Sequence, residues 1–517
     1  MNRIIILLLA LLATVGMGHA QTDVTYDVGM EGAVGSDGSM PYYVVSNRHG
    51  MVSPQNNSGY VTAGVAVEHK MGDWALDGRV KMEAQANAYS SAYLQECYGE
   101  LSWKKLSLMV GSKEQEPLLR DMQLSSGAWT WSGNSRPIPQ AKFGFNRFIA
   151  VPFSTRWLEF FFDGCYGKTI DGGWLQDRYE SYITRNPNAG DRYITRDYWY
   201  HYKRGYFRIN THSHIFFTAG IEHAAQFGGR SNSYSFQNLQ NGNIPEWNKQ
   251  PTDLGNFFSI LIPGRGDSNS PHDDQVFFYG NHVGSINFLM EYQWGRDMRH
   301  KVGAYLENPY EDGSGMRKGN GWDGIWGLEY HDKDADALVT GAVFEYIQTT
   351  HQSGPILWSP ENDHKGEAVA DFITNGVSGC DNYYNHYYYN GYHYYGMSMG
   401  TPMLKSPAFN NDDYLQFVHN RINAWHVGVN GHLYTFNTGK PSRIDYRVLG
   451  SYRKGWGTYH NPSSDIDTST NGLVELTWSR GPWNAALSYA FDRGEMFGNN
   501  HAVCLRLNYS GVLFKSK

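Results

Sequence analysis

A run of tyrosines between residues 383 and 395, interleaved with asparagine and histidine, has the side chains that a sugar-binding surface needs. Polysaccharides present apolar C–H faces and hydroxyl groups. They are therefore held by flat rings that stack and by amides, carboxylates or guanidinium groups that hydrogen-bond. Tyrosine and tryptophan offer this contact area at a low cost in conformational entropy. Equally, tyrosines that pack a loop against a wall seek hydrogen-bond partners when they are buried. The candidates for sugar binding here are Asp381, Asn382, Tyr383 and Tyr384.

A second cluster with the same chemistry lies earlier in the chain. It comprises Trp129, Trp131, Asn134 and Arg136. The two indole rings are suited to stacking on sugars, and the amide and guanidinium groups are suited to hydroxyl groups. Arg136 and Asp381 fit a different role as well, that of an internal ion pair that anchors one segment to another.

Motifs of catalytic chemistry are weak in this sequence. Gly266, Asp267 and Ser268 resemble the nucleophile block of an esterase family, but they lie in a polar loop rather than after a buried strand. Glycoside hydrolysis needs two carboxyl groups about 5 to 9.5 Å apart in one site, whereas the adjacent Asp273 and Asp274 fit a solvated loop better. The sequence has no HExxH, GxSxG, P-loop or dinucleotide motif. We therefore expect a protein that is not an enzyme and has no cofactor.

Metal binding finds little support in the spacing of possible ligands. The 20 histidines are dispersed, and none stands with cysteine or a carboxylate at the spacing of a zinc site. Glu311, Asp312 and Asp323 offer oxygen atoms for calcium in a glycine-rich stretch, but they lack EF-hand spacing. A charged hairpin loop is the interpretation we prefer, because loops commonly carry such residues. We expect no metal site.

The composition excludes two further classes of protein. The chain of 517 residues has a net charge of −7, which argues against a nucleic-acid partner, because phosphate neutralisation needs a basic surface. Its four cysteines are not clustered, which excludes a framework dense in disulfides.

The first 20 residues have the pattern of a cleavable signal peptide. An apolar core of 12 residues, 4–15, follows Arg3. It precedes a cleavage region with small residues that ends at Ala20. A helix needs about 20 residues to cross a bilayer, so this core is too short to span one. We expect residues 1–20 to direct export and residues 21–517 to form a single domain.

Apolar and polar residues alternate near the C-terminus, as they do in strands with one wet face. Val474, Leu476 and Trp478 share one face, and Glu475 lies on the other. A tight Gly-Pro turn follows, and the same period recurs in the next two segments. A soluble sandwich also shows this period. Aromatic residues at the ends of the apolar face, short turns alternating with long loops, and the signal peptide favour a transmembrane barrel.

The barrel expected from this pattern is large. At about 25 to 30 residues for each strand and its connection, the mature chain has room for roughly 16 to 20 strands, and we expect about 18. A barrel of that width has an aqueous interior unless loops fold inward. Residues 361–414 and 114–131 are candidates to plug it. In the second segment, Pro117, Leu118 and Met122 have spacings that predict one or two helical turns.

Several short motifs occur in a fixed order along the chain. They are Ser46-Asn47-Arg48-His49-Gly50, Ser125-Ser126-Gly127, Ser132-Gly133-Asn134-Ser135-Arg136-Pro137-Ile138-Pro139-Gln140, Glu311-Asp312-Gly313-Ser314-Gly315, Asp323-Gly324-Ile325-Trp326-Gly327, Asp381-Asn382-Tyr383-Tyr384-Asn385, Gly396 and Gly400-Thr401-Pro402. Together this ordered set resembles the Wzi-type capsule assembly proteins of Bacteroides-like bacteria. The resemblance extends over about residues 24–514, nearly all of the mature chain.

This resemblance implies a large outer-membrane β-barrel, occluded by inward loops and helices, that acts as a lectin and holds capsular polysaccharide at the cell surface. Its partners would be that polysaccharide, outer-membrane lipid and, during biogenesis, the barrel-assembly machinery. Two positions depart from the family. Cys380 stands where a glycine is common, and Phe514 is followed by three more residues although a terminal aromatic residue is the usual assembly signal.

We therefore predict an all-β, antiparallel outer-membrane barrel that binds and anchors capsular polysaccharide without catalysis. The alternative function is a porin, a diffusion channel for oligosaccharides or other small solutes. A charge-lined lumen suits both functions, and the same architecture serves both.

Overall fold

The computed structural model describes residues 21–516, apart from residues 37, 87–91, 191, 212, 235–236, 238–239, 243–246, 269, 271–277, 354–380 and 438–440. The predicted signal peptide, the carboxylates Asp273 and Asp274, and Cys380 lie outside the described residues. Within them, no helix combines the length and the apolar character that crossing a membrane requires.

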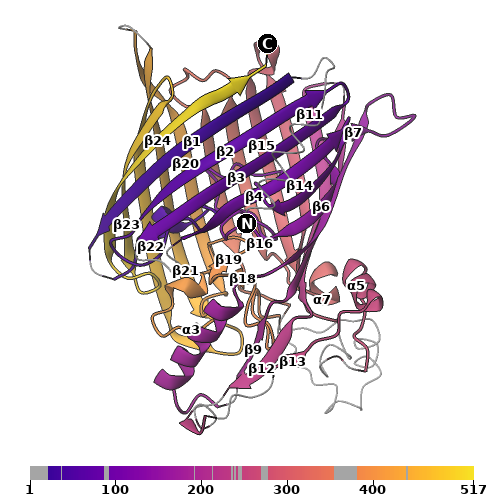
Figure 1. The fold of residues 1–517 in the computed structure, drawn as a ribbon, viewed down its shortest axis with the longest axis vertical. Helices are drawn as coiled ribbons and strands as arrows, with labels where there is room; N and C mark the ends of the chain where they lie inside the picture. The colour runs from indigo at the N-terminus through magenta and orange to yellow at the C-terminus, as the bar shows by residue number, and fades with distance from the viewer. Residues whose placement is uncertain are drawn as a thin grey trace.

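Eighteen strands of the described chain form one closed antiparallel barrel, which confirms the predicted fold class (Figure 1). Each strand pairs with its neighbour in sequence order, and β1 pairs with β24 to close the barrel. Closure leaves no unpaired sheet edge, as a strand structure in lipid requires. The strands are β1 (Gln21–Gly35), β2 (Gly59–Met71), β3 (Trp74–Ala86), β4 (Ala92–Trp103), β5 (Leu106–Ser112), β6 (Gln140–Phe145), β8 (Leu158–Lys168), β10 (Trp199–Asn210), β11 (Ile215–Phe227), β14 (Asn281–Trp294), β15 (His300–Tyr310), β16 (Gly324–Asp332), β17 (Gly341–Gln348), β20 (Ile422–Phe436), β21 (Ser442–Gly457), β22 (Pro462–Arg480), β23 (Trp483–Gly494) and β24 (Asn500–Lys515).

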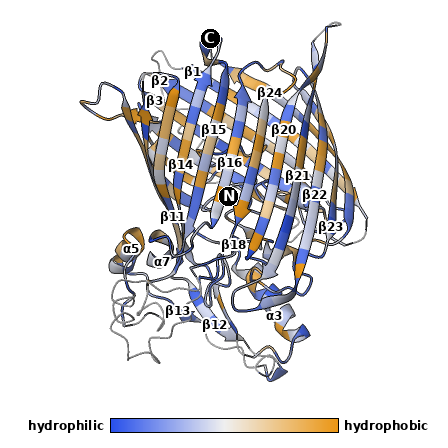
Figure 2. Ribbon diagram, turned by 180° about the vertical axis from the view of Figure 1, so that it is seen from behind, coloured by the Kyte–Doolittle hydropathy of each residue, from blue (hydrophilic) through white to orange (hydrophobic). Residues whose placement is uncertain are grey.

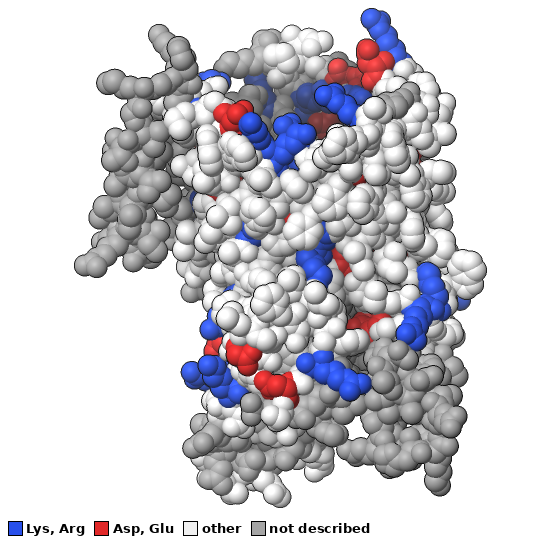
Figure 3. Space-filling view, turned by 90° about the vertical axis from the view of Figure 1, so that its right-hand side faces the viewer, with Lys and Arg blue, Asp and Glu red and all other residues white. Residues whose placement is uncertain are grey.

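The period-two pattern places apolar residues outside the barrel and polar residues inside it. Val474 and Leu476 are 50% and 44% exposed on the outer wall, whereas Glu475 is buried in the lumen. The same alternation produces the changing colours along each strand in Figure 2. Charged side chains are sparse across the middle of the molecule and gather towards its two ends in Figure 3. The outer wall is therefore a belt suited to hydrocarbon.

Aromatic residues border this belt at both ends, as they do in membrane barrels. Near the short turns, the rings of Trp74 and Trp103 lie 5.9 Å apart. Towards the opposite end, Trp425 lies 5.5 Å from Tyr346 and 6.1 Å from Tyr452. Amphipathic rings of this kind are stable at the level of lipid headgroups.

The two ends of the barrel differ in their connections. At the turn end, where both described termini lie, most strands are joined by short turns such as Gly481–Pro482. At the opposite end, the loop end, five long connections leave the strands: residues 36–58, 113–139, 169–198, 228–280 and 349–421. Outer-membrane barrels have short periplasmic turns and long extracellular loops, so the loop end faces the outside of the cell.

Three of these connections fold into the lumen and form a plug. They contribute α2 (Tyr42–Val45), the segment 113–139, and a segment from residue 381 to 421 with β18 (His393–Tyr394), β19 (Met397–Ser398) and η2 (Pro407–Phe409). The main hydrophobic core of the described residues is the interior of this plug and its contact with the lumen wall. The prediction of one or two helical turns in residues 114–131 is confirmed in part. The Ser125 amide donates to the Asp121 carbonyl at 2.8 Å and closes one helical turn, whereas the rest of this stretch is extended or irregular.

Other elements lie outside the lumen at the loop end. Leu175, Tyr179 and Ile183 repeat at intervals of four and pack one face of α3 (Gly172–Arg185) against Ile194 and Leu415. A small sheet joins β9, β12 and β13, and two short helices, α5 and α7, lie beside the barrel (Figure 1). These elements are β9 (Arg192–Arg196), β12 (Arg230–Tyr234), β13 (Asn248–Lys249), α5 (Leu254–Leu261) and α7 (Gly313–Met316); β7 (Ile149–Ala150) and η1 (Arg296–Met298) lie at the turn end.

Candidate functional site

Three of the eight predicted sugar-binding residues meet in the centre of the plug. The ring of Trp129 lies 5.0 Å from that of Tyr383 and 4.8 Å from that of Tyr384. All three side chains are fully buried. The structure therefore brings the two predicted clusters together, but their rings pack against one another in edge-to-face and tilted contacts.

The hydroxyl groups of these tyrosines hold the plug segments to each other. The Tyr384 hydroxyl donates to the Trp129 carbonyl, and that of Tyr383 donates to Asp323 Oδ2 at 3.1 Å. Burial raises the pKa of both tyrosines well above the usual range, so both remain protonated donors. Asn382, which is partly exposed, accepts a hydrogen bond from Asn420 Nδ2 at 2.6 Å.

Trp131 and Asn134 also serve contacts within the protein. Trp131 packs 5.9 Å from the ring of Tyr200 on the lumen wall. Asn134 accepts from the Asn47 amide at 2.8 Å and donates to the Ser398 carbonyl at 3.0 Å. One asparagine thus joins all three segments of the plug.

Arg136 and Asp381 contact different groups. The Arg136 guanidinium lies between two rings, 3.6 Å from the centre of Tyr93 and 4.6 Å from that of Tyr395. Asp381 accepts from the Ser353 hydroxyl at 2.6 Å. Burial and the neighbouring carboxylates raise the pKa of Asp381 well above its usual range.

Two buried glutamates of the wall hold the backbone of the second plug segment just after its one helical turn. Glu345 accepts from the Ser126 amide, and Glu307 accepts from the Trp129 amide, both at 2.7 Å. The wall thus satisfies two backbone donors that have no partner within the segment. Arg120 lies 3.4 Å from Glu307 and compensates its charge.

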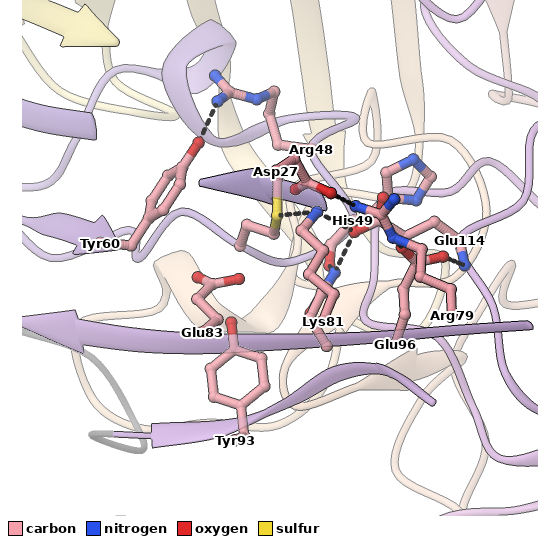
Figure 4. A network of polar contacts seen from close by, with 12 residues as sticks. Asp27, Arg48, His49, Tyr60, Arg79, Lys81, Glu83, Tyr93, Glu96 and Glu114 are labelled. Atoms are coloured by element: carbon pink, nitrogen blue, oxygen red, sulfur yellow. Dashed lines mark hydrogen bonds and ion pairs between the residues drawn. The ribbon is translucent and has the colours of Figure 1, made fainter. Parts of the chain in front are cut away.

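A network of charged and polar side chains joins the plug to strands β1 to β4 (Figure 4). Arg48 from the first plug segment reaches Glu31 at 2.6 Å, and Lys81 on β3 reaches Glu114 of the second at 3.0 Å. Glu114 also accepts from Gln95 at 2.9 Å. The interior face that the sequence predicted to be polar is therefore used in part to fix the plug.

The carboxylates considered for calcium likewise serve contacts within the protein. Glu311 accepts from the Tyr384 amide at 2.8 Å, and Asp312 accepts from the Ser314 amide at the start of α7 at 2.7 Å. Asp323 accepts from the Gln352 amide at 2.8 Å. Over the described residues, no group of three or more histidines, cysteines and carboxylates is arranged to hold a metal ion.

Exposed aromatic side chains gather at the outermost part of the loop end, on the surface that we call the tyrosine face. Tyr193 lies 5.3 Å from Tyr387 and 5.2 Å from Tyr388, measured between ring centres. Tyr182 lies 4.9 Å from Tyr414 beside them. Tyr387 is 52% exposed, and the other four are partly exposed.

Polar groups accompany the rings of the tyrosine face. Arg192 and Gln416 are partly exposed and line a small gap together with Tyr193 and Tyr387. Asn390 also lines this gap, but its side chain is buried. Gln416 accepts from the Tyr414 hydroxyl at 2.5 Å and donates to the His386 carbonyl at 3.4 Å. The face thus combines rings with a guanidinium group and an amide.

Sequence reasoning identified only part of this face. Tyr387 and Tyr388 stand in the tyrosine run that drew attention to the region. Tyr182, Tyr193 and Tyr414 belong to α3, β9 and the chain after η2, and each is a tyrosine among polar residues without a motif around it. Nothing in the local pattern marks these three for one surface.

The lumen also holds two cavities on the turn-end side of the plug. One has a volume of about 680 Å³ and is lined by charged groups that include Arg447, Arg506 and Glu475. The second, of about 640 Å³, includes Lys301 and Glu329. Arg447 and Arg506 reach Glu475 at 3.1 and 3.3 Å. The charge-lined lumen predicted from the sequence is thus present below the plug.

Comparison with known proteins finds similarity of structure only. No protein-family model and no curated protein matches the chain. Wzi from Escherichia coli, an outer-membrane carbohydrate-binding β-barrel involved in group 1 capsule assembly, is 14% identical over 93% of this chain and 83% of its own, with a TM-score of 0.49.

Channel-type barrels are similar to a comparable degree. The outer membrane protein OprD from Pseudomonas aeruginosa is 9% identical, covering 95% of this chain and 94% of its own, with a TM-score of 0.44. OccAB4 from Acinetobacter baumannii is 10% identical, covering 95% and 99%, with a TM-score of 0.42. Similarities this low do not transfer a function to this chain.

Proposed function

We propose that this protein is a non-catalytic outer-membrane lectin that anchors capsular polysaccharide at the cell surface through the tyrosine face. The observation that carries the proposal is the position of that face. It combines the exposed ring of Tyr387 and four partly exposed rings with the partly exposed Arg192 and Gln416, and it lies at the extracellular end of a lumen filled by a packed plug. A long polymer reaches such a surface from outside the cell without entering the barrel.

The capsular nature of the polymer follows from the sequence resemblance to Wzi-type capsule assembly proteins, and so does export by a cleaved signal peptide. The eight residues first selected have a supporting role in this proposal. Trp129 and Tyr384 fix the tyrosine run to the second plug segment, and so they hold Tyr387 and Tyr388 in place.

Alanine substitution of two rings tests the proposal. We expect Y193A/Y387A to weaken binding of purified capsular polysaccharide by about tenfold, since two stacking contacts of about 0.5 to 1.5 kcal/mol each are lost. Affinity is measured by titration of the detergent-solubilised barrel, and retention by the polymer released from cells. Y434A, which removes an exposed tyrosine on the outer wall near the turn end, is the matched control.

The outcome that contradicts the proposal is equal affinity in Y193A/Y387A and Y434A. Heat-modifiable gel migration shows that both variants are folded barrels. If Y383A and Y384A instead release polymer while the tyrosine-face variant retains it, the binding site lies at the residues first predicted.

A diffusion channel is the second candidate, and the two charge-lined cavities on the turn-end side favour it. Planar-bilayer recording separates the two functions. The lectin proposal expects no steady current from the purified protein, because the plug fills the lumen. A large steady current that oligosaccharides block would support the channel.

A further inference from the structure

The helix α5 lies against the outside of the barrel wall rather than in the lumen. Phe257 packs 5.2 Å from the ring of Trp199 and 5.1 Å from that of Phe227, both on the outward face of their strands. Tyr166, also outward, donates to the Phe257 carbonyl at 3.0 Å. Asp253 caps the helix, accepting from the Asn256 amide. The connection between β11 and β14 thus turns back over the outer wall.

The other side of this helix is apolar and uncovered. Leu254, Phe258 and Ile262 are 80%, 64% and 75% exposed, and their spacing of four places them in one stripe. Figure 2 shows α5 as a hydrophobic element beside the barrel. A short amphipathic helix on the outer wall of a membrane barrel, with its apolar stripe turned away from the protein, faces lipid.

A cavity of about 710 Å³ lies between the wall, α5 and α7. Phe162 and Ile221 form its floor, both outward residues aligned with Gly205 on the strand between them. Ile262 and Met316 form its sides. Because Phe162 and Ile221 belong to the lipid-facing belt, the cavity is continuous with the hydrocarbon layer.

Three cationic residues line this apolar cavity, and one of them, Arg204, is paired with the buried Asp163 at 2.9 Å. Lys203 lies on β10 two residues from Gly205 towards the loop end, and it donates to the Leu261 carbonyl at the end of α5. Arg317 follows α7 and is exposed. The carboxyls of Glu311 and Asp312 also line the cavity. Asp312 is engaged at the start of α7, and burial together with nearby Asp381 raises the pKa of Glu311 well above its usual range, which favours its uncharged form.

We propose that this cavity binds an outer-leaflet lipid with a phosphate-bearing headgroup, the class to which lipid A belongs. One acyl chain lies on Phe162 and Ile221, and the phosphate lies between Lys203 and Arg317. The apolar stripe of α5 is embedded in the same leaflet. The arrangement is chemically matched, because the apolar floor lies on the hydrocarbon side and the cations lie on the headgroup side.

Native mass spectrometry of the full-length barrel, extracted from the outer membrane in mild detergent, tests this proposal. We expect wild type to retain one lipid A per barrel and K203Q/R317Q to retain at least tenfold less. K318Q, which removes the exposed cation next to Arg317, is the matched control and should retain lipid as wild type does. I221W narrows the cavity without changing charge and should also lower occupancy.

Rebinding from mixed micelles distinguishes the sources of phosphate. Lipid A should rebind to delipidated wild type, and inorganic phosphate should neither bind nor compete. Equal retention in K203Q/R317Q and K318Q overturns the proposal, and so does displacement of the lipid by inorganic phosphate. Heat-modifiable migration of each variant confirms that the barrel is folded.

Discussion

At the scale of single residues, burial assigns roles that residue type leaves open. Tyr384 and Tyr387 stand three positions apart in one tyrosine run, yet Tyr384 is enclosed in the plug and Tyr387 is half exposed. The same phenol ring thus serves packing in one case and is presented to solvent in the other. Burial also decides the role of a carboxyl group. Asp171 is buried at the start of α3 and accepts from the Tyr395 amide at 3.1 Å.

The titration of Asp171 supplies a prediction about pH. Burial raises its pKa from 3.8 to about 7, so between these values the folded state holds a proton that the unfolded state has lost. Its contribution to stability is therefore full below about pH 4, declines as the pH rises, and is lost above about pH 7. We therefore expect hydrogen exchange at the Tyr395 amide, relative to its intrinsic rate, to become faster as the pH rises from 5 to 8.

The variant D171N should remove this pH dependence, because an amide does not titrate in that range. The same slope in wild type and D171N would show that another group is responsible. Exchange at the Asn47 amide, which donates to the side-chain oxygen of Asn134, provides an internal reference within each sample, because that acceptor does not titrate.

At the scale of elements, the plug is held by polar groups of the wall as much as by its own core. Residues 126–129 have no regular secondary structure, and their amide groups donate to Glu345 and Glu307. Removing one partner of a buried ion pair is costly, because the remaining charge stays uncompensated. The carboxylates are thus clamps between plug and wall.

We predict that E307A/E345A loosens the plug while the barrel stays closed. The loss of Glu307 leaves Arg120 buried without its carboxylate, at a cost of about 3 to 5 kcal/mol. The expected result is intermittent current in planar bilayers where wild type shows none. E159A, which removes a partly exposed wall glutamate paired with Arg208 near the turn end, should remain silent.

Silence of E307A/E345A in the same recordings would show that the aromatic core holds the plug without these carboxylates. Limited proteolysis from the extracellular side then measures whether residues 113–139 have become accessible. Equal protection in wild type and the double variant would contradict the assignment of the two glutamates as clamps.

At the scale of the whole molecule, the barrel is defined by its contact with lipid. The outward residues of β22 run from Ile466 near the loop end to Trp478 near the turn end, with Val474 between them. A charge on this row is costly in the hydrocarbon layer and inexpensive at the interface. The depth of each position therefore decides how a substitution acts.

We predict that V474R destabilises the folded barrel by about 2 to 4 kcal/mol, and that I466R does so by about 0 to 1 kcal/mol. Both positions lie on the same face of one strand, so the comparison isolates depth. Urea unfolding in lipid vesicles, followed by tryptophan fluorescence, measures the difference. Equal destabilisation by the two variants would contradict the assigned position of the membrane.

The sequence by itself determined the barrel and its outward face. Alternation with a period of two is a local property, since neighbouring side chains of a strand point to opposite sides whatever the rest of the chain does. Val474, Glu475 and Leu476 could therefore be assigned to lipid and lumen without any tertiary information. Two of the three plug segments were recognisable from their length and composition, whereas the segment that contains α2 was not.

Only the tertiary structure decided which loop residues are buried in the plug and which are exposed to solvent. Tyr182 and Tyr193 meet Tyr387 and Tyr414 because closure of the barrel brings two distant connections, 169–198 and 349–421, to one end. No local sequence pattern predicts that contact. Likewise, the spacing around Met122 predicted one or two helical turns, and one forms at residues 121–125. Beyond it, the carboxylates of distant strands accept from the amides of Ser126 and Trp129. Contacts between segments far apart in the chain decided the conformation there.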